Sequence, residues 1–223
     1  MSKKNILGRL STNKHFGAYI EKSLSRIRSY FSSSQNEEEL NRKLLNFYRP
    51  FSFFYRNGFP GRLKNSDIRE RKDFLIANAS PLAIDIGMQD GYFVKELNYA
   101  GCETMGVDNV AKLVRYAKKK DPAGKYFHGF AEELPFPDNT FQTAICSHIL
   151  EHVLYPDKLL RESKRVLKPN GKIIIIVPYE LGLEPTHLRD YNKETLLKEV
   201  GAFFTITEYF KKIGAGHGCI AYK

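Results

Sequence analysis

Two carboxylates and a glycine-containing turn stand close together in this chain and could bind a ligand. Asp85 lies in a short apolar run that leads directly into Gly87-Met88-Gln89-Asp90-Gly91. Glycines at such a turn let the backbone approach a ligand closely, and the Asp85 carboxylate could accept hydrogen bonds from an ammonium group. Asp108 follows the next apolar run, about 20 residues after the turn, where a carboxylate can hold a ribose diol. Alone, this pair is weak evidence, because a glycine turn after a strand is often only a turn.

The elements that must position these residues alternate between strand and helix. We predict strands at 82–86, 103–107, 125–128, 141–147, 173–177, 203–210 and 219–222. We predict helices at 65–78, 91–100, 110–120, from the end of the fourth strand through 167, and at 192–200. This alternation indicates an α/β, doubly wound, Rossmann-like and mostly parallel seven-stranded sheet. The last two strands are too close in sequence for a helical crossover, so we expect the last strand to be antiparallel.

The order of motifs from about Pro81 to Lys223 resembles the class I S-adenosylmethionine-dependent methyltransferases, in the branch that includes quinone and sugar methyltransferases. Five segments carry the resemblance: Ile84-Asp85-Ile86-Gly87-x-x-x-Gly91-Tyr92-Phe93, Gly106-Val107-Asp108, Ala131-Glu132-Glu133-Leu134-Pro135-Phe136-Pro137-Asp138-Asn139-Thr140-Phe141, Ser147-His148-Ile149-Leu150-Glu151-His152-Val153 and Glu162-x-x-Arg165-Val166-Leu167-Lys168-Pro169-Asn170-Gly171. Five matches in the right order are far more specific than any one of them.

The resemblance implies the residues that bind the cofactor, S-adenosyl-L-methionine. Asp85, Gly87 and Gly91 would line its methionine moiety, and Asp108 would bind the ribose hydroxyls. Gln89 stands where the family usually has glycine, so its side chain could crowd the cofactor or donate to its carboxylate.

Further positions follow from the same resemblance. Ala131 and Glu132 would flank the adenine, and Ser147 and His148 would face the sulfonium. A sulfonium methyl is already electrophilic, so catalysis needs in-line positioning and a base that removes a proton from the acceptor. The candidates for that base are His148, His152, His187 and Tyr191.

One other motif overlaps these histidines. His148-x-x-Glu151-His152 matches H-x-x-E-H, which supplies two metal ligands and a general base in inverted zinc proteases. The methyltransferase pattern accounts for the same residues without a metal, so we predict no metal site.

The positive charge of the chain is concentrated in its N-terminal third. The net charge is +10, of which residues 1–80 carry +9 and residues 81–223 carry +1. We divide the chain into a basic amphipathic segment (1–36), a helical and aromatic cap segment (37–80) and the methyltransferase domain (81–223). Residues 1–35 could pack on the domain, lie on an anionic membrane surface or act as a transit peptide. We predict that residues 37–78 fold over the cofactor site as part of the acceptor pocket.

Composition excludes some classes of protein. The longest aliphatic run, 173–177, is far shorter than the roughly 20 residues of a spanning helix. Three scattered cysteines suggest neither disulfides nor a thiolate zinc site, which favours a cytoplasmic location with peripheral membrane contact as an option.

The predicted function is methyl transfer to an O, N or C atom of a small-molecule, glycan-linked or lipid-linked acceptor. One alternative is an RNA methyltransferase that binds its substrate through the basic and aromatic N-terminal part of the chain. The other is a protein that has the cofactor-binding fold and binds a partner but transfers no methyl group. The acceptor and the oligomeric state cannot be read from the sequence.

Overall fold

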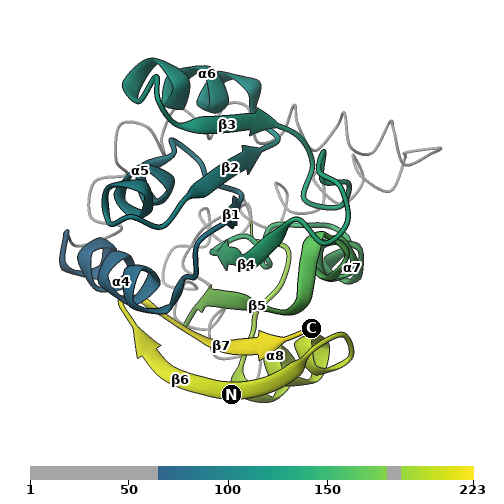
Figure 1. The fold of residues 1–223 in the computed structure, drawn as a ribbon. Coiled ribbons are helices and arrows are strands. Elements are labelled where there is room, and N and C mark those ends of the chain that lie inside the picture. Colours follow the sequence, from purple (N-terminus) through teal and green to yellow (C-terminus); the bar gives the residue numbers. More distant parts are fainter. Residues whose placement is uncertain (1–64, 180–186) are drawn as a thin grey trace, which may run out of the picture. The chain divides into compact units, whose positions relative to one another are not determined.

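A computed structural model describes residues 65–179 and 187–223, which form one seven-stranded α/β domain (Figure 1). Our predictions for residues 1–64, including the basic segment and most of the cap, lie outside the described residues. The strands are β1 (Ala83–Ile86), β2 (Thr104–Asp108), β3 (Lys125–His128), β4 (Phe141–Ser147), β5 (Leu167–Pro178), β6 (Thr205–Ile213) and β7 (Gly216–Tyr222). The helices are α4 (Asn65–Asn78), α5 (Tyr92–Tyr99), α6 (Ala111–Lys120), α7 (Pro156–Val166) and α8 (Lys193–Gly201).

The strand order β3-β2-β1-β4-β5-β7-β6 confirms the predicted doubly wound sheet. β1 pairs in parallel with both β2 and β4, and the chain reverses direction along the sheet between these two neighbours. β7 pairs antiparallel with β5 and with β6, as predicted for the last strand. In such sheets ligands bind beyond the carboxyl ends of the strands where the order reverses, which here is the edge between β1 and β4.

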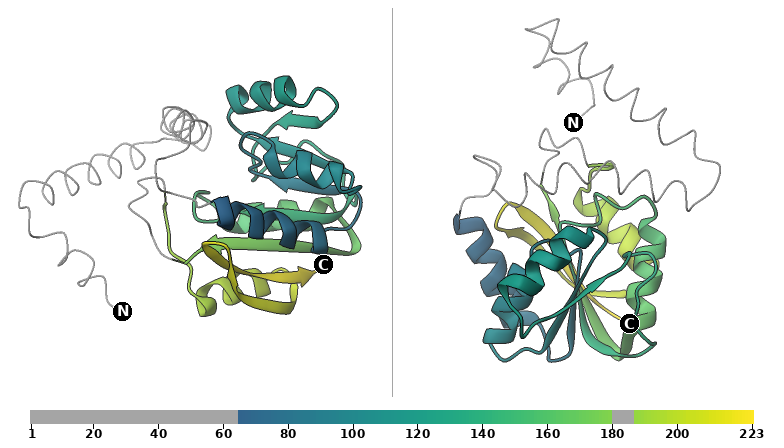
Figure 2. Two further views of the ribbon diagram at one scale, coloured as in Figure 1. Left: turned by 90° about the vertical axis from the view of Figure 1, so that its left-hand side faces the viewer. Right: turned by 90° about the horizontal axis from the view of Figure 1, so that it is seen from above.

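The two faces of the sheet are covered by different helices (Figure 2). Because successive strand residues point to opposite faces, Ile174 and Ile176 pack with Leu75 of α4 and Leu97 of α5. The alternate positions Ile173, Ile175 and Val177 join the cluster that contains Leu159 of α7 and Leu196 of α8. These apolar layers fix the strand ends that carry the candidate site. No helix of the described residues is long and apolar enough to cross a membrane.

One arginine holds the connection between β3 and β4 against α7. Arg165 donates to both carboxylate oxygens of Glu162, to Asp138 and to the carbonyl oxygens of Leu134 and Phe136. The amide of Leu134 in turn donates to Glu162 at 2.8 Å. The loop between β3 and β4, which contains the predicted adenine-flanking residues, is therefore hydrogen-bonded to α7.

The structure corrects the prediction for the residues that follow β4. We predicted a helix directly after residue 147, but α7 begins only at Pro156. Residues 148–155 instead form turns, starting with His148 at a φ of 56°, a left-handed value that a helix cannot contain. These turns place polar side chains at the carboxyl edge of the sheet.

Candidate active site

The turn after β1 has a backbone that only glycine adopts easily at two of its positions. Gly87 and Gly91 have φ values of 77° and 79°. A Cβ atom on Gly87 would lie 2.4 Å from Cδ1 of Ile149, and one on Gly91 would lie 2.7 Å from the ring of Tyr126. The backbone conformation and the lack of space for a Cβ atom therefore explain why glycine stands at these two positions of the turn.

Gln89 adopts the same left-handed conformation, with a φ of 54°, although it has a side chain. Its side chain is exposed, and its backbone amide donates to Oδ2 of Asp108 at 2.9 Å. The positive φ explains physically why glycine suits this position. Within the described residues, Gln89 contributes its backbone to the site.

We expect Gln89→Gly to raise the free energy of unfolding by up to about 1 kcal/mol. A left-handed conformation costs an ordinary residue about 1–2 kcal/mol, and the extra freedom of glycine in the unfolded chain offsets part of that gain. Urea denaturation measures the change. Asn139→Gly is the control, because Asn139 has the same φ of 54° but asparagine tolerates this region better, so its gain should be smaller. A destabilised Gln89→Gly variant would contradict the assignment of strain.

Asp108 at the end of β2 is braced by the backbone. It is 7% exposed, and its two oxygens accept hydrogen bonds from the amides of Gln89 and Val110 at 2.9 and 2.8 Å. Burial raises the pKa of Asp108 to about 6, and these two donors limit the rise. Each carboxylate oxygen retains a further lone pair that a hydroxyl group of a ligand could use.

Asp85 on β1 is more deeply buried, with an exposure of 2%. Burial and the nearby charge of Asp108 raise the pKa of Asp85 to about 7, and attraction to Arg71 opposes that rise. Its Oδ2 atom has no hydrogen-bond partner among the described residues. A buried acceptor of this kind carries a cost unless a donor reaches it.

Arg71 projects from α4 into the same region and is 5% exposed. Its Nη1 donates to the hydroxyl of Ser147 at 3.2 Å, and its guanidinium lies 5.3 Å from the ring centre of Phe93. Burial lowers the pKa of Arg71, while attraction to Glu151, Asp67 and Asp85 raises it. Nε of Arg71 also has no hydrogen-bond partner in the described part of the chain.

These two buried groups fit the amino-acid end of S-adenosylmethionine. Asp85 offers an acceptor for an ammonium group, and Arg71 offers a donor for a carboxylate. Asp108 lies one strand away with lone pairs for the ribose. The residues present therefore suit the cofactor that the sequence resemblance implies.

Arg71 was missed by the sequence analysis. It stands four residues before Leu75, the fully buried leucine of α4, and therefore on the same face of the helix. A single cation on the apolar face of the helix before the first strand was the available signal. Only the fold shows that this face ends beside Ser147 and Asp85.

His148 contacts the buried carboxylate of Glu151. Its Nδ1 lies 3.7 Å from Oε1 of Glu151, and its Nε2 has no hydrogen-bond partner among the described residues. Burial, followed by the charge of Arg71, lowers the pKa of His148 well below its usual value. These surroundings favour the neutral imidazole, whose Nε2, unpartnered among the described residues, offers a lone pair.

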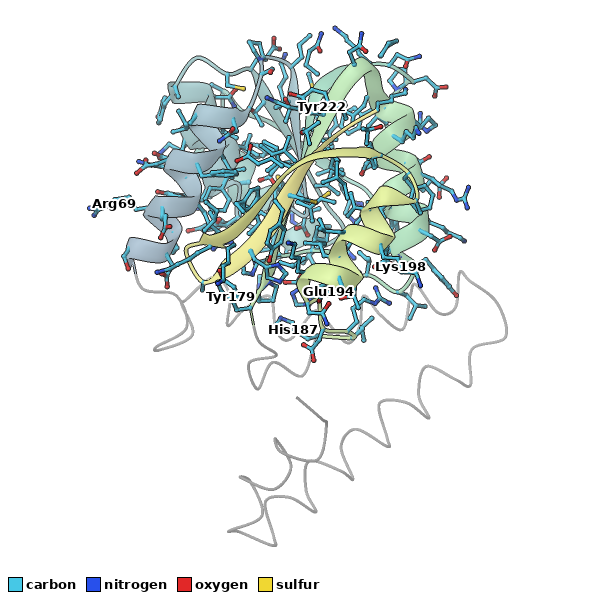
Figure 3. All side chains as sticks on the ribbon, turned by 90° about the horizontal axis from the view of Figure 1, so that it is seen from below. Arg69, Tyr179, His187, Glu194, Lys198 and Tyr222 are labelled. Atoms are coloured by element: carbon cyan, nitrogen blue, oxygen red, sulfur yellow. The ribbon has the colours of Figure 1, made fainter. Side chains whose placement is uncertain are left out.

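Two of the other candidate bases lie close to each other. The ring centres of His152 and His187 are 4.8 Å apart, edge to face, and Nε2 of His152 is 3.7 Å from Oε1 of Glu151. Figure 3 shows His187 at the same end of the domain as Tyr179, which directly follows β5, and far from Tyr222 at the opposite end. The structure thus brings His148, His152 and His187 to one edge of the sheet.

The remaining predicted residues have different surroundings. Tyr191 is buried, and its hydroxyl donates to Glu199 at 2.6 Å; burial and this carboxylate raise its pKa. A phenol that is already bound to a carboxylate is poorly suited to remove a proton from an acceptor. Ala131 is buried and Glu132 half-buried in the loop after β3.

Comparison with known proteins shows what this domain is similar to. Residues 84–175 match the family model described as a methyltransferase domain. An uncharacterized protein of Methanocaldococcus jannaschii is 36% identical over 92 residues, which cover 41% of this chain and 42% of that protein. The ubiquinone/menaquinone biosynthesis C-methyltransferase of Pasteurella multocida is 38% identical over 77 residues, covering 34% of this chain and 29% of that protein.

A solved structure has a similar fold. A SAM-dependent methyltransferase from Aquifex aeolicus superposes with a TM-score of 0.58 at 20% identity, covering 69% of this chain and 88% of that chain. Residues 84–175 thus match a methyltransferase domain, and the described residues have the fold of an S-adenosylmethionine-dependent methyltransferase, in agreement with the motifs. The chain spans less than half the length of the two curated relatives named above.

Proposed function

We propose that this protein transfers a methyl group from S-adenosylmethionine to an O, N or C atom of a small-molecule acceptor. The observation that carries the proposal is the pair of buried groups Asp85 and Arg71, each with an atom lacking a hydrogen-bond partner among the described residues. They stand where the strand order reverses, beside the turn that starts at Gly87. Their opposite charges match a zwitterionic amino-acid group.

The work of the protein is to hold and orient the reactants. When bound, the cofactor supplies a methyl group that is already activated by a sulfonium. Asp85 and Arg71 would hold its amino-acid end, and Asp108 its ribose. Ser147, whose hydroxyl accepts from Arg71, would border the reacting end. Of the candidate bases, we propose His148, since its surroundings favour the neutral imidazole and its Nε2 has no hydrogen-bond partner among the described residues.

A small-molecule acceptor is supported by the named relative from Pasteurella multocida, which methylates carbon in quinone biosynthesis according to its name. The family model matches residues 84–175, a range that includes the predicted cofactor-binding residues. The RNA alternative depends on the basic and aromatic N-terminal part of the chain, of which residues 1–64 lie outside the described residues.

We expect Asp108→Ala to weaken S-adenosylmethionine binding by about 10- to 150-fold. One charge-assisted hydrogen bond contributes about 1.5–3 kcal/mol, and the buried carboxylate would lose its ribose contacts. Calorimetric titration of the purified chain measures the affinity. Asp157→Ala is the control, because Asp157 is exposed at the start of α7. Absence of any binding by the unaltered protein would overturn the proposed function.

A further inference from the structure

Three metal-binding side chains meet beyond the end of β4. Glu151, His152 and His187 each offer one ligand atom, and these atoms all lie within 4.8 Å of one another. The Glu151 side chain is 1% exposed and that of His152 is 20% exposed. Two imidazoles and one carboxylate are a common ligand set for divalent transition metals.

Backbone hydrogen bonds fix the two segments that carry these three side chains, the turns after β4 and the segment that contains His187. The amide of His152 donates to the carbonyl of Ile149 at 2.9 Å, which closes the turn that carries Glu151. The amide of Leu188 donates to the carbonyl of Glu151 at 2.8 Å, so the residue after His187 is fixed beside the turn. Rigid support of this kind favours a preformed site.

A half-buried arginine adds to this support. The guanidinium of Arg189 donates to the carbonyl oxygens of Leu150, Val153 and Leu154, at 3.2, 2.6 and 3.1 Å. Arg189 lies two residues after His187 and holds the turn that carries Glu151 and His152. The two ligand-bearing segments are therefore joined by side-chain as well as backbone hydrogen bonds.

This arrangement differs from the H-x-x-E-H site considered from the sequence. That motif requires the two histidines one helical turn apart, but residues 148–155 are not helical and His148 has a left-handed φ. The structure joins Glu151 and His152 to a third residue, His187, that lies 35 positions further along the chain. His148 contacts Glu151 through Nδ1.

We propose that Glu151, His152 and His187 bind one divalent transition-metal ion of the zinc class. Ligand atoms about 2.0–2.2 Å from a tetrahedral ion are about 3.4 Å apart. Nε2 of His152 and Oε1 of Glu151 already lie 3.7 Å apart, so binding requires the wider spacings, of up to 4.8 Å, to close toward that value. Three protein ligands leave at least one coordination position open for an outside ligand.

The position of this ion suggests the chemistry of the acceptor, an inference that rests on the proposed function. Ile149, two residues before Glu151, packs against Gly87 of the predicted cofactor turn. The turn that carries Glu151 and His152 therefore adjoins the predicted cofactor site. A divalent ion lowers the pKa of a hydroxyl that it coordinates. The O–H bond would then break with its proton passing to Nε2 of His148, the base proposed above, which contacts Glu151 through Nδ1, and an anionic oxygen would remain as nucleophile. We therefore infer a hydroxyl-bearing acceptor.

To test the site, the full untagged chain is first treated with a chelator to remove bound metal and is then titrated with metal ions. We expect one Zn²⁺ or Co²⁺ per chain by calorimetry, with visible absorption bands for Co²⁺. Mg²⁺ should bind at least tenfold more weakly, since it prefers oxygen ligands. His187→Asn and His152→Asn should each lower Co²⁺ affinity by about a hundredfold or more.

His128→Asn is the matched control, because His128 is an exposed histidine on β3 outside the cluster. It should bind Co²⁺ as the unaltered chain does. S-adenosylmethionine titration of His187→Asn separates the two proposals, because cofactor binding should persist in this variant. Failure of Zn²⁺ and Co²⁺ to bind, or binding that survives both His152→Asn and His187→Asn, would overturn the metal site.

A second measurement addresses the acceptor class. Catechol, added to the Co²⁺-loaded chain, should shift the visible spectrum by entering the open positions. An unchanged spectrum would overturn the hydroxyl-bearing acceptor while leaving the metal site and the proposed function standing.

Discussion

Asp85→Asn stabilises the ligand-free protein above pH 7 and at the same time removes most of its affinity for S-adenosylmethionine. The carboxylate of Asp85 is buried near Asp108, and among the described residues Arg71 is the cation that offsets its charge. Asparagine has nearly the same shape but no charge to bury. The same loss of charge removes the acceptor that we expect to hold the ammonium group of the cofactor.

The pH dependence has a definite sign. The pKa of Asp85 rises from 3.8 to about 7 in the folded protein. Below pH 3.8 both states hold the proton, so the contribution to stability is fully present. Between about pH 4 and 7 the unfolded chain releases it while the folded chain retains it, so the free energy of unfolding falls as pH rises. With 1.36 kcal/mol per pKa unit, the cost above pH 7 is at most about 4 kcal/mol.

Thermal unfolding at several pH values tests this expectation. The advantage of Asp85→Asn over the unaltered protein should be largest above pH 7 and small near pH 4. Asp73→Asn is the control, because the Asp73 side chain is 62% exposed on α4. An Asp85→Asn variant that is less stable than the unaltered chain at pH 8 would show that burial of this charge is not costly.

Cofactor affinity provides the second readout of the same residue. An ammonium group favours the ionised carboxylate, so binding below about pH 7 should release up to one proton per Asp85. Calorimetry at pH 6 in buffers of different ionisation enthalpy measures that release. Asp108, whose pKa is raised to about 6, could add a smaller contribution. Binding without any proton release would contradict the ionisation of Asp85 in the complex.

Arg71→Met should weaken S-adenosylmethionine binding by about a hundredfold or more. A guanidinium that binds a carboxylate makes charge-assisted hydrogen bonds of about 1.5–3 kcal/mol each, and each 1.4 kcal/mol is tenfold in affinity. Arg71→Lys should recover only part of the loss, because lysine lacks the planar pair of donors. Calorimetric affinities of the variants give the comparison.

A truncated ligand makes the Arg71 prediction specific. Methylthioadenosine lacks the amino-acid group, so Arg71→Met should bind it about as well as the unaltered protein does. Asp108→Ala, in contrast, should bind both ligands more weakly. Lys72→Met is the matched control, because Lys72 neighbours Arg71 on α4 but pairs with Asp73. Equal losses for both ligands in Arg71→Met would point to a general distortion of the fold.

The sequence predicted the sheet well because local signals agreed with tertiary packing. The strand at 173–177 is an unbroken aliphatic run, which a strand buried on both faces requires. The helix expected directly after β4 was wrong because apolar residues such as Leu150 and Val153 continue through the turns. Leu150 and Val153 pack into the core although the backbone that carries them is not helical. Spacing alone does not separate these cases.

The carboxylates of the candidate site were predictable because they lie at the carboxyl ends of β1 and β2. Arg71 and the group formed by Glu151, His152 and His187 were not, because each depends on side chains that come together from distant elements. His187 reaches Glu151 only because the segment after β5 is hydrogen-bonded back to the turns after β4. That pairing has no counterpart in residue spacing.

The hydrogen bonds of Arg165 bear on the entropy of ligand binding. Its guanidinium connects α7 to the carbonyls of Leu134 and Phe136 in the ligand-free protein, close to Ala131 and Glu132. The loop predicted to flank the adenine is thus preorganised, and its loss of conformational freedom occurs on folding rather than on association. A nucleoside that enters this side of the domain would meet a loop already held by hydrogen bonds, so less of its interaction energy would be consumed in ordering the protein.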